Sequence, residues 1–256
     1  MTRETVHIVA SSGCEKVSFS RRSPLRFICR AMHAGFFIVI GTLLSGVCGG
    51  LFFPHNPEAA KLLSACAFSS ALIMIVLIGG ELFTGSSMIM AISFFERDCR
   101  ISDVLRVWLF CYLGNFIGIL FLCALFSLSG TISPQIISYI SLSFETKLYS
   151  PWYTLFIKGA LCNLLVCIGV FSSYRLKSEG AKALIIFIVI LGFVLLGLEH
   201  SIANMASFSF SAMLLPKSDF AAMAKNLFWV SMGNIAGGVF LYALPLWFSA
   251  EKKEDK

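Results

Sequence analysis

The chain has 256 residues, of which 57% are hydrophobic and only 13% are charged. This composition excludes an ordinary soluble domain, because the apolar residues fall in blocks long enough to cross a bilayer, which takes roughly 20 residues. The net charge of +6 does not indicate nucleic-acid binding. The basic residues cluster between the apolar blocks, where they set the orientation of a membrane protein.

In chain order, the apolar blocks cover residues 34–53, 62–93, 107–128, 152–172, 183–209 and 227–248. They predict an all-α membrane protein with six transmembrane helices. Before them, residues 1–26 form a polar and basic N-terminal arm, which we expect in the cytoplasm. Residues 27–250 then form one six-span domain, and residues 251–256 form a cytoplasmic tail.

The orientation follows from the basic residues. If the N-terminus is cytoplasmic, 15 of the 20 lysines and arginines lie inside, and Lys158 falls within the fourth block. Only four lie outside: Lys61, Lys147, Lys217 and Lys225. Because cytoplasmic loops carry the excess of positive charge, both termini are predicted to face the cytoplasm. We therefore expect a multi-pass protein of the cell (inner) membrane.

The second and fifth blocks share a pattern that indicates an internal duplication. Glu81 and Glu199 each interrupt an apolar run, and they lie 118 residues apart (199 − 81). Each is followed by a Gly-Asn step, with Asn115 after the first and Asn234 after the second. With three spans in each half, the second half would be inserted upside down, which predicts an inverted three-helix repeat.

Both blocks also contain residues that can break a helix. The candidates are Gly79-Gly80 and Gly85-Ser86-Ser87 in the second block, and Gly197 with residues 201–204 in the fifth. Backbone that leaves a helix at membrane depth must be buried in protein or line a cavity. The helices that restart would point partly positive N-termini at that cavity. The two breaks thus predict a position near the bilayer midplane that favours anions.

The polar residues near the breaks each allow two interpretations. Glu81 and Glu199 either accept backbone hydrogen bonds freed by the breaks, which their symmetry favours, or carry protons. His200 has Leu82 at the matching position, so it breaks the symmetry. It either ties two helices together or, as we favour, donates hydrogen bonds and protons to a solute. Asn115 and Asn234 are expected to satisfy broken backbone.

No metal site or cofactor is expected. The nine cysteines contain no CxxC pair, and no histidines or cysteines have ligand spacing. An intramembrane serine protease would need a Gly-x-Ser-x-Gly step near the membrane histidine, which is absent, so the chain is not expected to be an enzyme.

Taken together, the motifs resemble the formate/nitrite transporter family. The matching pieces are residues 81–85, residues 158–167, residues 199–205 and both Gly-Asn steps. The resemblance implies an aquaporin-like fold with broken second and fifth helices, in which the six-span domain is a channel. It also implies a homopentamer with a pore through each protomer.

The resemblance places the family's pore residues on this chain. Phe68 and Phe193 match an outer aromatic constriction, and His200 and Thr84 match the central pair. Further narrowing residues match Leu72, Leu82, Phe83 and Val166. Lys147, sixteen residues before Asn163, matches a lysine that helps to draw anions in. The remaining polar support comes from Asn163, Glu81, Glu199, Asn115 and Asn234.

The implied function is passage of a small monovalent anion or its weak acid across the lipid bilayer. Formate or nitrite is favoured, moving as the protonated species or together with a proton. Hydrosulfide and lactate remain alternatives in the same fold. A neutral-solute channel of the aquaporin type would need two Asn-Pro-Ala steps, whereas the sequence has one Asn-Pro, at Asn56-Pro57, followed by Glu58.

Overall fold

A computed structural model describes residues 3–250, except for the side chains of residues 143–145. The described chain is almost entirely helical, and the expected tail, residues 251–256, lies outside the described residues. The elements are α1 (Arg3–Arg22), α2 (Pro24–Phe52), α3 (Pro57–Phe68), α4 (Ser70–Ile78), α5 (Phe83–Phe95), α6 (Ile101–Leu128), α7 (Pro134–Leu148), α8 (Trp152–Arg175), α9 (Glu179–Leu195), α10 (Ser201–Leu214), α11 (Phe220–Ala236), the π-helix η1 (Gly237–Ala243) and α12 (Leu244–Ser249).

Within residues 3–250, five helical segments are long and apolar enough to cross a membrane. These segments are Pro24–Phe52, Pro57–Ile78, Ile101–Leu128, Trp152–Arg175 and Phe220–Ser249. The expected fifth block instead consists of α9, with 17 residues, and α10, with 14. The prediction of an all-α membrane protein is confirmed, whereas the count of six spans stays a prediction.

Both expected helix breaks are present, and each has a glycine among its first two residues. Helix α4 ends at Ile78 and α5 starts at Phe83, while α9 ends at Leu195 and α10 starts at Ser201. Gly79 and Gly197 have φ angles of 112° and 64°, a backbone region that glycine adopts without steric cost. The two glycines are separated by the same offset as Glu81 and Glu199.

Two other candidate break positions were wrong. Residues 85–87 lie in α5, and residues 201–204 lie in the first turn of α10. Small polar side chains are compatible with a helix when they bond back to it, as the Ser87 hydroxyl does by donating to the Thr84 carbonyl at 2.6 Å. The sequence pattern therefore identified each break but extended it too far.

The helices pack in two matching pairs. Helix α2 runs along α6 in the first half, and α8 runs along α11 in the second. Each crossing is close because a glycine lies at it. A Cβ at Gly35 would lie 2.5 Å from the Asn115 carbonyl oxygen, and one at Gly233 would lie 2.1 Å from the Phe156 carbonyl oxygen. Small residues of this kind allow membrane helices to approach closely.

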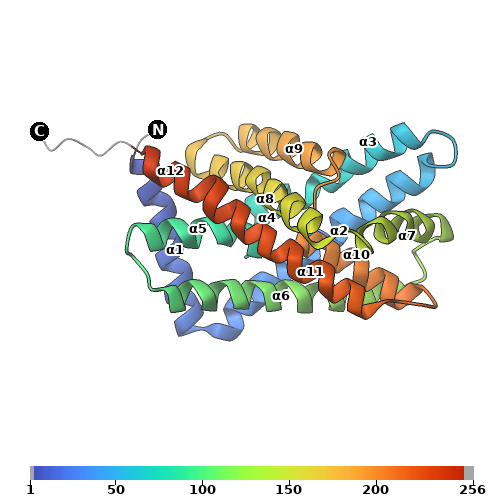
Figure 1. Cartoon of the computed structure of the whole chain (residues 1–256), viewed down its shortest axis with the longest axis horizontal. Helices are drawn as coiled ribbons and strands as arrows, with labels where there is room; N and C mark the ends of the chain where they lie inside the picture. Colours follow the sequence, from blue (N-terminus) through green and yellow to red (C-terminus); the bar gives the residue numbers. More distant parts are fainter. Residues whose placement is uncertain (1–2, 251–256) are drawn as a thin grey trace, which may run out of the picture.

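The N-terminal arm is a docked helix. Val6, Val9 and Ala10 of α1 are fully buried, and the Ser93 hydroxyl of α5 donates to the Ala10 carbonyl at 3.0 Å. Glu96, at the end of α5, accepts from Arg3 of α1 and also from the indole of Trp247 in α12. Figure 1 shows α1 and α12 at one end of the molecule and α7 at the other.

Candidate functional site

The two helix breaks meet at a buried pair of side chains, His200 and Thr84. His200 caps the N-terminus of α10, where its Nδ1 accepts the Ala203 backbone N–H at 3.1 Å. Because a backbone N–H can only donate, Nδ1 carries no proton, and the proton of the neutral ring lies on Nε2. That Nε2 lies 3.0 Å from Thr84 Oγ1, so the imidazole donates to the hydroxyl.

The contact also brings two helix N-termini together. Thr84 is the second residue of α5, and His200 directly precedes α10. Each N-terminus carries partial positive charge from its unpaired amide groups. The centre of the molecule therefore combines two hydrogen-bond donors with two positive helix ends, an arrangement that favours a negative charge.

Two aromatic rings cover this pair on one side. The Phe193 ring stacks on the His200 ring, with centroids 6.0 Å apart and an angle of 18° between the planes. Phe68 meets Phe193 edge to face at 6.0 Å. The structure thus brings the expected aromatic residues together beside the histidine. That they form a constriction remains a prediction.

A cavity of about 330 Å³ reaches the aromatic pair and His200 from the α7 side. Its wall includes Lys61, Lys147, Lys158 and Glu199. We call this space the vestibule. Leu72, Leu82, Phe83 and Val166 are at most 4% exposed and belong to the continuous apolar core.

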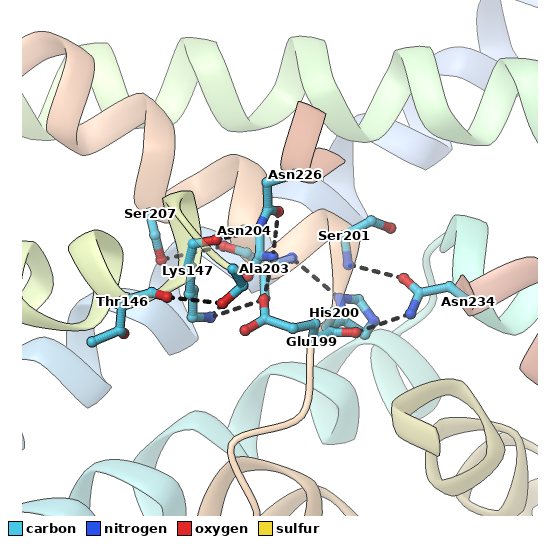
Figure 2. A network of polar contacts seen from close by, with 11 residues as sticks. Thr146, Lys147, Glu199, His200, Ser201, Ala203, Asn204, Ser207, Asn226 and Asn234 are labelled. Atoms are coloured by element: carbon cyan, nitrogen blue, oxygen red, sulfur yellow. Dashed lines mark hydrogen bonds and ion pairs between the residues drawn. The ribbon is translucent and has the colours of Figure 1, made fainter. Parts of the chain in front are cut away.

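A polar network surrounds Glu199 at the wall of the vestibule (Figure 2). Its Oε2 accepts from Asn204 Nδ2 at 2.6 Å and lies 3.7 Å from Lys147 Nζ. Lys147 also donates to Asn204 Oδ1 at 2.9 Å. Asn204 Nδ2 makes a second bond by donating to Asn226 Oδ1 at 2.9 Å. The carboxylate and the ammonium group thus neutralise each other. Asn226 was not predicted as a site residue, because it lies outside the motifs of the sequence.

Asn115 and Asn234 bind the broken backbone in the same way. The amide of Asn234 donates to the carbonyls of Gly159 and Glu199, at 2.8 and 3.0 Å, and accepts the Ser201 N–H at 2.9 Å. The amide of Asn115 donates to the carbonyls of Ala31 and Glu81, at 2.7 and 2.8 Å, and accepts the Phe83 N–H at 3.0 Å. Both are fully buried.

Asn163 links three helices beneath the central pair. Its Nδ2 donates to the Thr84 carbonyl at 3.3 Å, the Ser87 hydroxyl at 2.8 Å and the Asn234 carbonyl at 2.6 Å. Its Oδ1 is buried and has no partner among the described residues. Asn163 thus holds α5, α8 and α11 together beside Thr84.

Glu81 has a partner that the sequence did not indicate. Its carboxylate pairs with the Lys16 ammonium of α1, 65 residues earlier in the chain. Burial, the largest influence, lowers the pKa of Lys16, but the Glu81 carboxylate together with Tyr174 and Cys111 raises it above its ordinary value. Since Lys16 belongs to a polar arm without periodic signals, only the three-dimensional packing reveals this contact.

These features define a class of protein. A multi-pass helical membrane protein whose interrupted helices converge on a buried polar centre has the architecture of a transporter or channel. The sequence model described as formate/nitrite transporter matches residues 3–248. The chain therefore belongs to the formate/nitrite transporter family.

Known proteins agree over nearly the whole chain. The nitrite transporter NirC of Salmonella typhimurium is 30% identical over 99% of this chain and 94% of its own length. A solved structure of an FNT family ion channel superposes with a TM-score of 0.90 at 29% identity, covering 97% of this chain and 99% of that one. The solved structure of a pentameric formate channel with formate bound superposes with a TM-score of 0.77 at 26% identity. The match covers 90% of this chain and 98% of that one.

Proposed function

We propose that the chain passes small monovalent anions, with formate or nitrite favoured, as the weak acid or together with a proton. The observation that carries this proposal is the contact of His200 Nε2 with Thr84 Oγ1, at the meeting point of two helix N-termini. On one side of the pair lies the vestibule, and the aromatic rings and apolar core enclose the rest.

Energetic magnitudes favour passage with a proton. An unpaired anion taken out of water into an apolar slit loses hydration worth tens of kcal/mol. Protonating a carboxylic acid with a pKa of about 4 at pH 7 costs only about 4 kcal/mol, at 1.36 kcal/mol per pH unit. A path that first gathers the anion and then neutralises it therefore faces a much lower barrier.

The proposed pore roles are those that the family resemblance implies. Phe68 and Phe193 form the constriction next to the vestibule, while Leu72, Leu82, Phe83 and Val166 narrow the path beyond His200. Apolar constrictions of this kind exclude hydrated ions. The names of the similar proteins support this substrate class, because NirC is a nitrite transporter and one solved channel binds formate.

The test is flux into proteoliposomes of the purified protein. Formate, nitrite, hydrosulfide and lactate are each offered under set pH gradients, with glycerol as the neutral solute. We expect formate or nitrite uptake that grows when the outside is more acidic. Glycerol uptake without anion uptake would instead establish a neutral-solute channel.

We further propose a homopentamer in the cell (inner) membrane, with one pore in each protomer and both termini in the cytoplasm. The pentameric formate channel supports the assembly. The shared position of α1 and α12 at one end supports the orientation of the termini (Figure 1). Native mass measurement of the solubilised complex should give five copies; a dominant monomer or trimer in several mild detergents would contradict this proposal.

A further inference from the structure

We propose that Lys61 and Lys158, rather than Lys147, capture the anion in the vestibule, together with the hydroxyl pair of Ser45 and Ser64. The inference rests on the proposed function and assigns its first binding step to particular residues. All five side chains belong to residues that line the same cavity of about 330 Å³. Both lysines therefore border the space through which an anion would approach His200.

Lys147 is poorly placed to attract an anion, because its charge is already engaged. Its ammonium group lies 3.7 Å from Glu199 Oε2 and donates to Asn204 Oδ1 at 2.9 Å. An incoming anion would compete with a buried carboxylate, whose loss of a partner is costly. Lys147 thus acts as a structural counter-ion of Glu199.

Lys61 and Lys158 keep their charges available. Neither has a carboxylate within 4.0 Å among the described side chains. Lys158 is fixed beside the break, because its backbone carbonyl accepts the Glu199 N–H at 3.4 Å. Lys158 lines the vestibule together with Glu199 and His200, while the exposed Lys61 lies on α3.

Two hydroxyls of the vestibule wall, those of Thr42 and Ser207, already donate to backbone carbonyls. Ser45 and Ser64 are different, since their hydroxyl oxygens lie 2.5 Å apart and bond to each other. Only one hydrogen can lie between two hydroxyl oxygens, so the other stays free to donate. Ser64 is also three residues after Lys61, on the same face of α3.

The charge of the cavity wall agrees with this assignment. Among the lining residues, three are lysines and one is a glutamate. Because Lys147 cancels Glu199, the excess positive charge belongs to Lys61 and Lys158. A cavity lined by charge of one sign raises the local concentration of opposite ions and does so less as salt increases.

The experiment compares Lys61→Gln/Lys158→Gln with wild type in proteoliposomes, using initial rates of formate and nitrite flux over a range of concentrations. Potassium gluconate sets the ionic strength from about 0.01 to about 1 M. The matched control is Lys225→Gln, which removes an exposed lysine that is not part of the cavity wall. Lys61→Arg/Lys158→Arg keeps the charges.

At low salt we expect the double glutamine variant to raise the half-saturating concentration about three- to tenfold with little change in maximal flux. The difference should shrink at high salt, and the arginine variant should restore wild-type behaviour. Equal half-saturation in the double glutamine variant and Lys225→Gln would overturn the inference. Absence of anion flux in the wild type would instead refute the proposed function.

Discussion

The breaks at Glu81 and Glu199 share a backbone frame but differ in chemistry. At each break, a glycine with positive φ ends one helix, and an asparagine from a later helix satisfies the exposed backbone. Each glutamate also donates its N–H to a basic residue of a neighbouring helix, Arg30 for Glu81 and Lys158 for Glu199.

The side chains around the two frames have diverged. Leu82 follows the first glutamate, whereas His200 follows the second. The Glu81 side is covered by α1, whose Lys16 pairs with the carboxylate and whose Phe19 lies 5.2 Å beneath the Arg30 guanidinium. The Glu199 side opens to the vestibule, where Lys158 has no such cover. The two breaks thus share a backbone scaffold, while the side chains around them differ.

The largest expected effect tests whether the asparagines at the two breaks contribute equally to the stability of the protein. Asn115→Leu and Asn234→Leu each leave two buried backbone groups of the break unpaired, one carbonyl and one N–H, at about 1–3 kcal/mol per group. We expect both variants to lose about 2–6 kcal/mol of stability and to unfold at clearly lower temperatures in detergent. Thermal unfolding of the purified proteins measures this loss.

A strong loss in one asparagine variant and wild-type stability in the other would show that only one break depends on its asparagine. The exposed Asn56→Ala at the start of α3 is the control, since it removes a single N-cap bond from the Ala59 N–H. Its expected cost is about 1 kcal/mol.

The second prediction distinguishes the roles of Lys16 and Lys147, which pair with the glutamates of the two breaks. Lys16→Gln and Lys147→Gln each leave a nearly buried carboxylate without its counter-ion, which costs about 3–5 kcal/mol. Only Lys16→Gln should also loosen α1. Limited proteolysis should therefore cut within residues 3–22 faster in Lys16→Gln than in Lys147→Gln.

The double variants Lys16→Gln/Glu81→Gln and Lys147→Gln/Glu199→Gln should recover part of the lost stability, because no unpaired charge remains. Double variants that are less stable than the single lysine variants would rule out the ion pairs as the cause.

The third prediction makes the second break resemble the first. His200→Leu removes the Nε2 donor while the apolar surroundings remain, and we expect anion flux to fall about 10- to 100-fold, because a hydrogen bond to a charged group contributes about 1.5–3 kcal/mol. His200→Asn keeps a donor but cannot exchange a proton, so it should change the pH dependence of flux. Proteoliposome flux between about pH 5 and 8 measures both effects.

Identical pH profiles of wild type and His200→Asn would leave the histidine a structural cap and assign the proton to water or to the solute before it enters. Leu82→Asn, at the matching position of the first break, is the control.

Much of this fold could be predicted from the sequence, because bilayer length and the repeated Glu and Gly-Asn motifs are local signals. The central pair and the aromatic residues were assigned from the family resemblance, and the structure places them side by side. The Lys16 contact with Glu81 was beyond prediction, since it joins a polar arm to a residue 65 positions later. The sequence indicates Lys61 only as one of the outside charges and Lys158 only as a residue of the fourth apolar block, because their shared cavity exists only after folding.

The smallest expected effect concerns Thr84, the one contribution of the first break to the central pair. Thr84→Val keeps the shape of the side chain and removes a hydroxyl that lies 3.0 Å from His200 Nε2. The loss of one hydrogen bond, worth about 1 kcal/mol, predicts a fall in flux of about fivefold. Thr84→Ser keeps the hydroxyl and should stay near wild type, with flux measured at a fixed pH gradient. If Thr84→Val transported as fast as Thr84→Ser, the first break would contribute backbone alone, and the polar chemistry of the pore would belong to the second break.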